Sequence, residues 1–289
     1  PQSYNCMIKL PQGKSNFRQL VEEGFHYVDK TGYIRVLEGM SNSYLFYMRP
    51  RRFGKSLLVS MLMHYYGEQH RGDFERLFGA YDIGRNPTPL ANRYLTLSFD
   101  FSGIDTSTRK GVEVGFLRNV LGGIRKFLFR YPHYFEANKE WEEIKQQNKG
   151  VVDAVQQLFE LVETKAPGKE VYLFIDEYDH FANEILAYDF DYFREILSTQ
   201  GFVRKFYEAI KTATASGVVA RFFGTGVMPL TLDSMTSGFN IATNATNDRW
   251  LGAMMGFRET DVRTILEGIE APPDKFDDML RDMKVWYDG

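Results

Sequence analysis

The sequence predicts an α/β fold of three layers, in which a mainly parallel central sheet carries helices on both faces. Residues 44–48 and 171–175 are continuous apolar runs, which suit strands covered on both sides. Residues 94–99 are rich in strand-forming and apolar residues and indicate a further strand. Stretches with helical spacing alternate with these runs, and this order is typical of a parallel sheet with crossover helices.

The other elements follow from apolar spacing and from the residues that break it. In chain order we expect helices at 16–23, 33–37, 55–66, 116–131, 151–162 and 192–214 (interrupted near Gly201), a strand at 218–223, and a largely helical stretch at 230–289. The charged segment 138–150 is expected to be exposed. We divide the chain into a lead-in (1–40), a core (41–229) and a helical lid or adaptor (230–289).

Residues 49–56 read Arg-Pro-Arg-Arg-Phe-Gly-Lys-Ser and connect the first strand to the helix at 55–66. The start of a helix offers unpaired N–H groups and a positive dipole end, so it attracts phosphate. Gly54 allows close backbone approach, Lys55 can reach the β- and γ-phosphates, and the Ser56 hydroxyl can bind Mg²⁺. The predicted nucleotide-binding residues are Arg51, Arg52, Phe53, Gly54, Lys55, Ser56 and Leu57.

This loop departs from the phosphate-binding consensus at one position. G-x-x-x-x-G-K-[ST] requires a glycine where the chain has Arg49. The loop also carries other cations, at Arg51, Arg52 and Lys55. A solvated basic loop is the alternative interpretation of this cluster.

The second predicted motif lies at the end of the apolar run 171–175, where Asp176 and Glu177 follow. Carboxylates at the carboxyl end of such a strand lie where open α/β sheets bind ligands. In P-loop ATPases the first carboxylate of the pair holds the Mg²⁺ shell and the second activates the attacking water. Asp176 and Glu177 match these roles, although an acidic strand end that faces solvent is the alternative. Together the two motifs, of Walker A and Walker B type, predict a P-loop NTPase.

The strand at 218–223 ends in Gly224-Thr225-Gly226. The hydroxyl of Thr225 is placed to contact the γ-phosphate or the attacking water, and an ordinary turn residue is the alternative. We expect the loop around Lys55 and the strand of Asp176 to meet at the carboxyl edge of the sheet. The spacing between the two motifs leaves room for an added strand between them.

Several separated motifs resemble those of the AAA-ATPase-like family of predicted bacterial P-loop ATPases. They are Tyr27–Thr31, the loop 49–56, Ile175–Asp179, Gly224–Val227, Ser237–Ile241 and Trp286–Gly289. The resemblance implies the additional-strand type of core, binding of ATP with Mg²⁺, and arginine in place of the first loop glycine. Many members continue into a nuclease-like domain of PD-(D/E)XK type, which is expected to be absent from this chain. A protein or nucleic acid partner is expected through such a missing domain.

Composition limits the remaining functions. The net charge of −3 gives no overall attraction to nucleic acid or to anionic membranes. Cys6 is the only cysteine, so neither an intrachain disulfide nor a thiolate zinc site can form. No apolar stretch approaches the about 20 residues that a membrane span needs, and a cytoplasmic protein is expected. Pro1 and the end directly after Trp286-Tyr287 suggest a trimmed chain.

Three hypotheses follow for the function. The first is Mg²⁺-dependent ATP hydrolysis coupled to a conformational change, with Lys55, Glu177 and Thr225 as catalytic residues and Ser56 and Asp176 as metal ligands. The second is a nucleotide-binding module with little hydrolysis, which Arg49 motivates. The third is a nuclease, for which only part of the carboxylate set is visible. Candidates for a transition-state arginine are Arg51, Arg52, Arg249 and Arg258, the last two acting on a neighbouring subunit in an oligomer.

Overall fold

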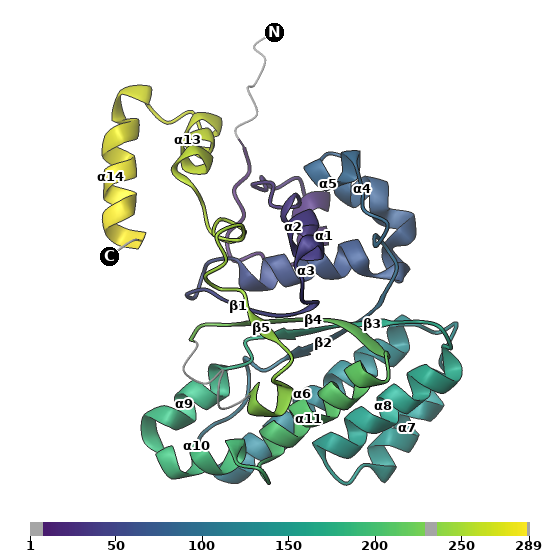
Figure 1. The fold of residues 1–289 in the computed structure, drawn as a ribbon. Helices are drawn as coiled ribbons and strands as arrows, with labels where there is room; N and C mark the ends of the chain where they lie inside the picture. The colour runs from purple at the N-terminus through teal and green to yellow at the C-terminus, as the bar shows by residue number, and fades with distance from the viewer. Residues whose placement is uncertain (1–7, 229–235, 288–289) are drawn as a thin grey trace.

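The computed structural model describes residues 8–228 and 236–287 and has three layers, with a sheet between two groups of helices (Figure 1). The strands are β1 (Tyr44–Met48), β2 (Leu95–Asp100), β3 (Val171–Asp176), β4 (Val219–Gly226) and β5 (Thr243–Asn244). Their spatial order is β2-β3-β4-β1-β5, and every neighbouring pair is parallel. The predicted α/β class and parallel sheet are confirmed.

The position of β4 explains how the two motif strands are arranged. β1 leads into the loop of Lys55, β3 ends in Asp176, and β4 pairs with both of them. The added strand expected between the motifs is therefore β4. The strand that contains Leu95, β2, lies on the outer side of β3.

The apolar runs are continuous because the central strands are buried on both faces. In β3, Val171, Leu173 and Ile175 pack into one hydrophobic cluster, and Tyr172 and Phe174 pack into the cluster on the opposite face. A strand with one solvated face would instead alternate between apolar and polar residues. Successive side chains of β3 therefore do point to opposite faces, but the sequence does not show this alternation because all of these residues are apolar.

One group of helices covers each face of the sheet (Figure 1). On the first face lie α3 (Lys55–Tyr66) and, around it, α1 (Phe17–Glu22), α2 (Tyr33–Gly39), α4 (Phe74–Phe78) and α5 (Asp82–Arg85). On the second face lie α6 (Arg109–Arg130), α8 (Val151–Lys165) and α11 (Phe202–Ala215), with α7 (Ala137–Gln147), α9 (His180–Tyr188) and α10 (Phe190–Leu197) beside them. The predicted bounds of α3 are confirmed.

Two helices differ from the expectations from sequence. The segment 138–150 was expected to be an exposed charged stretch, but α7 occupies most of it and buries Glu140 and Ile144. The helix α9, which follows the acidic motif directly, was not predicted. Its apolar residues Phe181, Ala182 and Ile185 do have helical spacing and are buried.

After residue 235 the chain returns to the sheet before it becomes helical. β5 was not predicted, and it pairs with β1 through Leu45↔Thr243 and Phe46↔Asn244. α13 (Glu259–Gly268) and α14 (Phe276–Tyr287) confirm the expected helical segment only after residue 258. Residues 240–258 were also expected to be largely helical, but they contain β5 and irregular structure, because this part of the chain packs against β1. The boundary expected near 230 falls in residues 229–235, outside the described part, and the division into three segments stays a prediction. Among the described residues, no helix combines the length and apolar character needed to cross a membrane.

Candidate functional site

The loop between β1 and α3 has a row of backbone N–H groups without a hydrogen-bond acceptor among the described residues. Gly54 caps α3 in the left-handed region with φ 87°, and Arg52 is also left-handed with φ 70°. No group in residues 8–228 or 236–287 accepts a hydrogen bond from the amides of residues 52–57. Unpaired donors at the start of a helix attract anions. Phosphate binding by this loop stays a prediction.

Lys55 is buried beside this loop, with 5% of its surface exposed. Its ammonium donates hydrogen bonds of 3.1 Å to the carbonyl oxygens of Arg49 and Pro50. Burial lowers the pKa of Lys55, and the nearby carboxylates of Glu177 and Asp176 oppose that shift. The lysine and the acidic pair, about 120 residues apart in sequence, thus act on each other electrostatically. Their convergence at one edge of the sheet is the arrangement that the two motifs predict.

Asp176 is held by its neighbours through one oxygen only. Its Oδ1 accepts hydrogen bonds from the Thr225 hydroxyl at 2.5 Å and from the Glu177 amide at 3.1 Å. Oδ2 has no hydrogen bond with any described residue, and the same holds for the hydroxyl of Ser56. Thr225 is fully buried, so its hydroxyl faces Asp176 rather than solvent. Its predicted contact with a γ-phosphate stays a prediction.

These two oxygens, which have no partner among the described residues, are of the chemical type that binds Mg²⁺ together with a phosphate. Mg²⁺ is commonly bound through one or two protein ligands together with substrate phosphates and water. In the described part of the chain no group of three or more His, Cys, Asp or Glu residues could hold a metal by itself. Ser56 and Asp176 would therefore hold Mg²⁺ only together with a nucleotide.

Glu177 lies in a tight turn directly after β3. Its backbone is left-handed, with φ 51°, which is uncommon for a residue with a side chain. The turn is fixed by a hydrogen bond from the His180 amide to the Glu177 carbonyl, 3.2 Å long. The carboxylate is half-buried and makes no hydrogen bond to a described residue. Strained backbone of this kind is concentrated at functional sites.

Asp179 is a site residue that was not among the predicted catalytic or binding residues. It is fully buried, and its carboxylate accepts hydrogen bonds from the amides of Val227 and Met228, of which the shortest is 2.8 Å. The side-chain amide of Asn183 donates a further bond of 2.9 Å. Asp179 therefore ties the turn of Glu177 to the loop that follows Thr225. In the sequence, the only sign of this role is an aspartate three residues after Asp176. The backbone amides that it binds are 48 and 49 residues away, so its role could not be predicted.

The side chain of Arg49 points away from the phosphate loop. Its guanidinium donates to the carbonyl oxygens of Met48 and Thr246, both at 3.0 Å, and of Gly252 at 3.3 Å. It also lies over the ring of Tyr47, 4.5 Å from the centroid. The bulky residue at the consensus glycine position thus anchors the segment after β5 and does not fill the phosphate loop.

The other candidate arginines have separate positions. Arg51 donates to Nδ1 of His180 at 3.2 Å, and Arg52 is exposed. Arg258 donates to the Tyr33 hydroxyl at 2.9 Å, whereas Arg249 is exposed and lies 4.8 Å from the ring centroid of Trp250. Only Arg51 and Arg52 belong to the phosphate loop itself.

Close packing explains the glycines on either side of Thr225. A Cβ at Gly224 would lie 2.5 Å from the ring of Phe46, and one at Gly226 would lie 2.3 Å from the ring of Tyr178. Neither distance is tolerated by well-packed atoms. The Gly-Thr-Gly motif therefore lets these two rings pack against the strand that positions Thr225.

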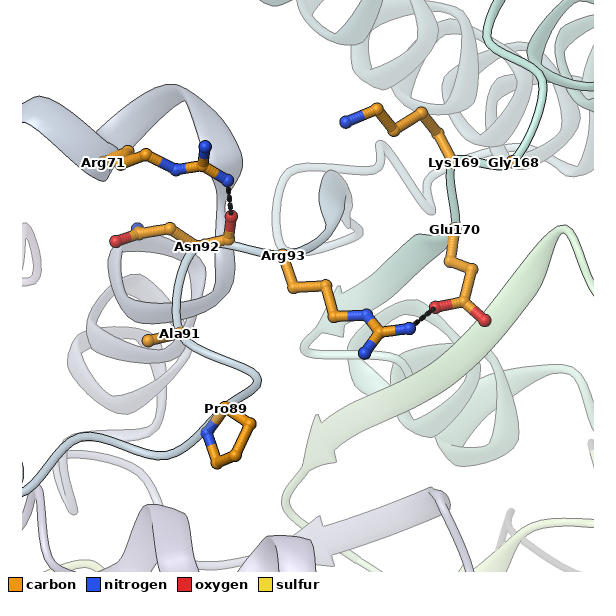
Figure 2. Close-up of a pocket in the computed structure, with 8 residues that line it drawn as sticks. All are labelled: Arg71, Pro89, Ala91, Asn92, Arg93, Gly168, Lys169 and Glu170. Atoms are coloured by element: carbon orange, nitrogen blue, oxygen red, sulfur yellow. Dashed lines mark hydrogen bonds and ion pairs between the residues drawn. The ribbon is translucent and has the colours of Figure 1, made fainter.

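A separate pocket of about 320 Å³ lies at the opposite edge of the sheet, where β2 and β3 begin (Figure 2). Its cations have partners, since Arg71 donates to the Asn92 carbonyl at 3.2 Å and Arg93 lies 3.7 Å from Glu170. Ligands of open α/β sheets bind instead at the carboxyl ends of the strands. We assign no ligand to this pocket, and none of the predicted site residues lines it.

Comparisons with known proteins show what the whole chain is similar to. Residues 11–236 match the model of the AAA-ATPase-like family, described as a predicted AAA-ATPase. A protein from Azotobacter chroococcum mcd 1, the "Uncharacterized protein in vnfD 5'region", is 28% identical over 283 residues, which are 97% of this chain. The chain spans about half of that relative, 48% of its length. No solved structure matches.

Proposed function

Because the chain belongs to the family of predicted AAA-ATPases, which implies nucleotide binding, we propose that it binds ATP with Mg²⁺ and hydrolyses the β–γ bond. The observation that carries this proposal is the position of Lys55. It is buried beside the free amides of residues 52–57 and within the electrostatic reach of Asp176 and Glu177. A phosphate-binding loop and an acidic pair are the two parts that phosphoryl transfer to water requires.

Each side chain has a proposed task in this reaction. Lys55 and the amides of residues 52–57 bind the β- and γ-phosphate oxygens, where negative charge develops. Ser56 and Asp176 would hold Mg²⁺, which would neutralise phosphate charge. Glu177 accepts a proton from the attacking water. Thr225 keeps Asp176 oriented through their hydrogen bond.

The alternative hypotheses gain little support from the geometry. A non-hydrolysing module was suggested by Arg49, but the Arg49 side chain lies against Thr246 and Gly252 and leaves the loop open. A nuclease would need further carboxylates for metal, yet both oxygens of Asp179 are already bonded to backbone amides. We also propose that hydrolysis is coupled to a conformational change, and that the protein has a protein or nucleic acid partner.

Binding and turnover test the proposal separately. Calorimetry would measure the Kd of Mg²⁺ with a non-hydrolysable ATP analogue, and phosphate release from Mg²⁺-ATP would measure turnover. Lys55→Ala should weaken binding about ten- to a hundred-fold, since a charge-assisted hydrogen bond contributes roughly 1.5–3 kcal/mol. Glu177→Gln should keep the affinity and lose turnover by about a hundred-fold or more. EDTA should abolish turnover.

Matched controls come from the second face of the molecule. Lys126→Ala on α6 and Glu163→Gln on α8 make the same chemical changes at exposed positions. Both should bind and turn over like the wild type. Equal affinity in wild type and Lys55→Ala would contradict the phosphate site, and full turnover in Glu177→Gln would remove Glu177 from its role.

A further inference from the structure

An exposed aromatic ring is held in place beside the phosphate loop. Phe257 is 67% exposed. Its preceding neighbour, Gly256, donates its amide to the Phe53 carbonyl at 3.2 Å, and its following neighbour, Arg258, donates to the Tyr33 hydroxyl at 2.9 Å. The backbone before Phe257 is therefore tied to the phosphate loop, and the side chain of the residue after it is tied to α2, while the ring itself is exposed.

The segment that carries Phe257 is anchored along its length. The Ala245 amide donates to the Phe46 carbonyl at 2.8 Å, and the Tyr47 hydroxyl donates to the Leu251 carbonyl at 2.6 Å. Leu251, Met254 and Met255 are buried in the cluster around α3. In Figure 1 this segment leaves β5 and passes the beginning of α3 before it reaches α13. Phe257 thus ends a well-packed segment rather than a loose one.

The strand order fixes the direction in which a bound nucleotide would extend. Asp176 and Thr225 lie on β3 and β4, on one side of β1, so the terminal phosphate points to that side. β5 lies on the other side of β1, and the segment 245–258 follows it. The base end of the nucleotide must therefore leave the phosphate loop toward the segment of Phe257.

We propose that Phe257 is the platform on which a purine base stacks, with the Tyr33–Arg258 pair at the edge of the base. This inference rests on the proposed nucleotide site. An aromatic ring accepts a base through its π-face, and a purine offers a larger face than a pyrimidine. The guanidinium and hydroxyl of the pair supply the polar groups that a base edge needs. Phe257 would thus determine base preference without touching the phosphates.

Two probes distinguish the contribution of the base to the affinity from that of the phosphates. Calorimetry measures the Kd of Mg²⁺-ATP and of Mg²⁺-tripolyphosphate, which has the phosphates but no base, with wild type and Phe257→Ala. We expect the variant to bind ATP about ten-fold more weakly, because stacking of one base on an aromatic side chain contributes roughly 1–3 kcal/mol. Its affinity for tripolyphosphate should be unchanged, which also shows that the loop has folded.

Two further variants define the role of the ring. Phe257→Tyr keeps the aromatic face and should bind ATP within about two-fold of wild type. Phe129→Ala removes an exposed phenylalanine, 44% exposed, from α6 on the other face of the sheet, and should leave both affinities unchanged. In the wild type, ATP and GTP should bind more tightly than CTP and UTP.

The outcomes distinguish this inference from the proposed function. If the wild type binds ATP and Phe257→Ala binds it equally well, the base does not stack on Phe257, and the proposed nucleotide site is unaffected. Wild-type affinities that do not depend on the base, or that match tripolyphosphate, also contradict the platform, even if the variant does not fold. If Phe257→Ala changes the sedimentation of the protein and not its ATP affinity, the ring contacts a second copy and the inference is overturned. If the wild type binds neither probe, both proposals fail.

Discussion

The buried hydroxyl of Thr225 donates a 2.5 Å hydrogen bond to Oδ1 of Asp176, from β4 to the adjacent strand β3. Together with the Glu177 amide, it uses one oxygen of the carboxylate and leaves Oδ2 without a partner among the described residues. The bond therefore leaves Oδ2 as the oxygen that would face the proposed Mg²⁺. A mutation of Thr225 tests that relationship without removing a proposed ligand.

Thr225→Val should raise the Mg²⁺ concentration needed for half-maximal phosphate release by about ten-fold. Valine has nearly the same shape but leaves a half-buried carboxylate oxygen with one donor fewer, at a cost of about 1–3 kcal/mol. Thr225→Ser keeps the hydroxyl and should restore most of the wild-type value. The measurement is a Mg²⁺ titration of ATP turnover for the three proteins. An unchanged half-maximal concentration in the valine variant would show that Thr225 does not position Asp176.

The carbonyl contacts of Arg49 predict a stability effect at the consensus glycine position. Arg49→Gly removes hydrogen bonds to the carbonyls of Met48, Thr246 and Gly252. We expect the free energy of unfolding, measured in urea, to fall by about 1.5–3 kcal/mol. The loss would appear although the change restores the consensus sequence.

Arg52→Gly is the matched control, because it removes the same charge three residues later. Arg52 has φ 70°, and glycine adopts this left-handed conformation without steric strain. We expect no loss of stability in this variant, or a small gain. If Arg49→Gly is as stable as Arg52→Gly, the contacts of Arg49 with the segment after β5 contribute nothing measurable.

The parts of the fold that sequence could predict are those with local signals. Residues 44–48 and 171–175 are apolar at every position, so their burial on both faces was visible. The helix Lys55–Tyr66 begins after Gly54 and ends before Gly67, and its bounds follow from those two residues. Both proposed phosphate motifs could likewise be predicted from sequence, since the residues of each motif are contiguous along the chain.

The parts that could not be predicted depend on distant partners. Arg49 bonds to carbonyls 197 and 203 residues away, and no local pattern indicates them. Asp179 likewise bonds to amides 48 and 49 residues later. β5 has two residues, too few for a period of two to be visible. The segment after β5 therefore appeared as part of a helical lid, although it borders the phosphate loop.

A stacked pair of histidines predicts loss of stability in acid. The rings of His64 and His70 have centroids 4.4 Å apart, and burial lowers the pKa of His70 from 6.5 to about 3. Between these two values the unfolded chain binds a proton that the folded protein does not, so stability falls as pH decreases from 6.5 towards 3. Arg18 and Arg130 disfavour the charged form further, and Asp73 favours it.

Urea unfolding at several pH values between 7.5 and 5 would check this effect. The pH slope of wild-type stability should exceed that of His70→Gln by up to one bound proton. His133→Gln changes an exposed histidine and should keep the wild-type slope. Parallel curves for wild type and His70→Gln would show that His70 titrates equally in both states.

Glu140 predicts an opposite dependence on pH. It is 3% exposed, and neither carboxylate oxygen has a hydrogen-bond partner among the described residues. Burial raises the pKa of Glu140 above its ordinary 4.5, and the charge of Lys165 only partly opposes that shift. The folded protein thus keeps a proton that the unfolded chain releases, and stability falls as pH rises from 4.5 through the raised pKa.

Replacing this carboxyl with an apolar side chain should therefore stabilise the protein. We expect Glu140→Leu to gain about 1–3 kcal/mol at pH 7.5, because it removes a buried charge without a partner. At pH 4.5 the gain should be smaller, since the raised pKa makes the folded wild-type carboxyl more protonated there than at pH 7.5. Glu143→Leu, on the exposed side of the same helix, should change stability by no more than about 0.5 kcal/mol. An equal gain at both pH values would show that size and polarity, rather than charge, make Glu140 unfavourable, and a loss at pH 7.5 would mean that its carboxylate is stabilised where it lies.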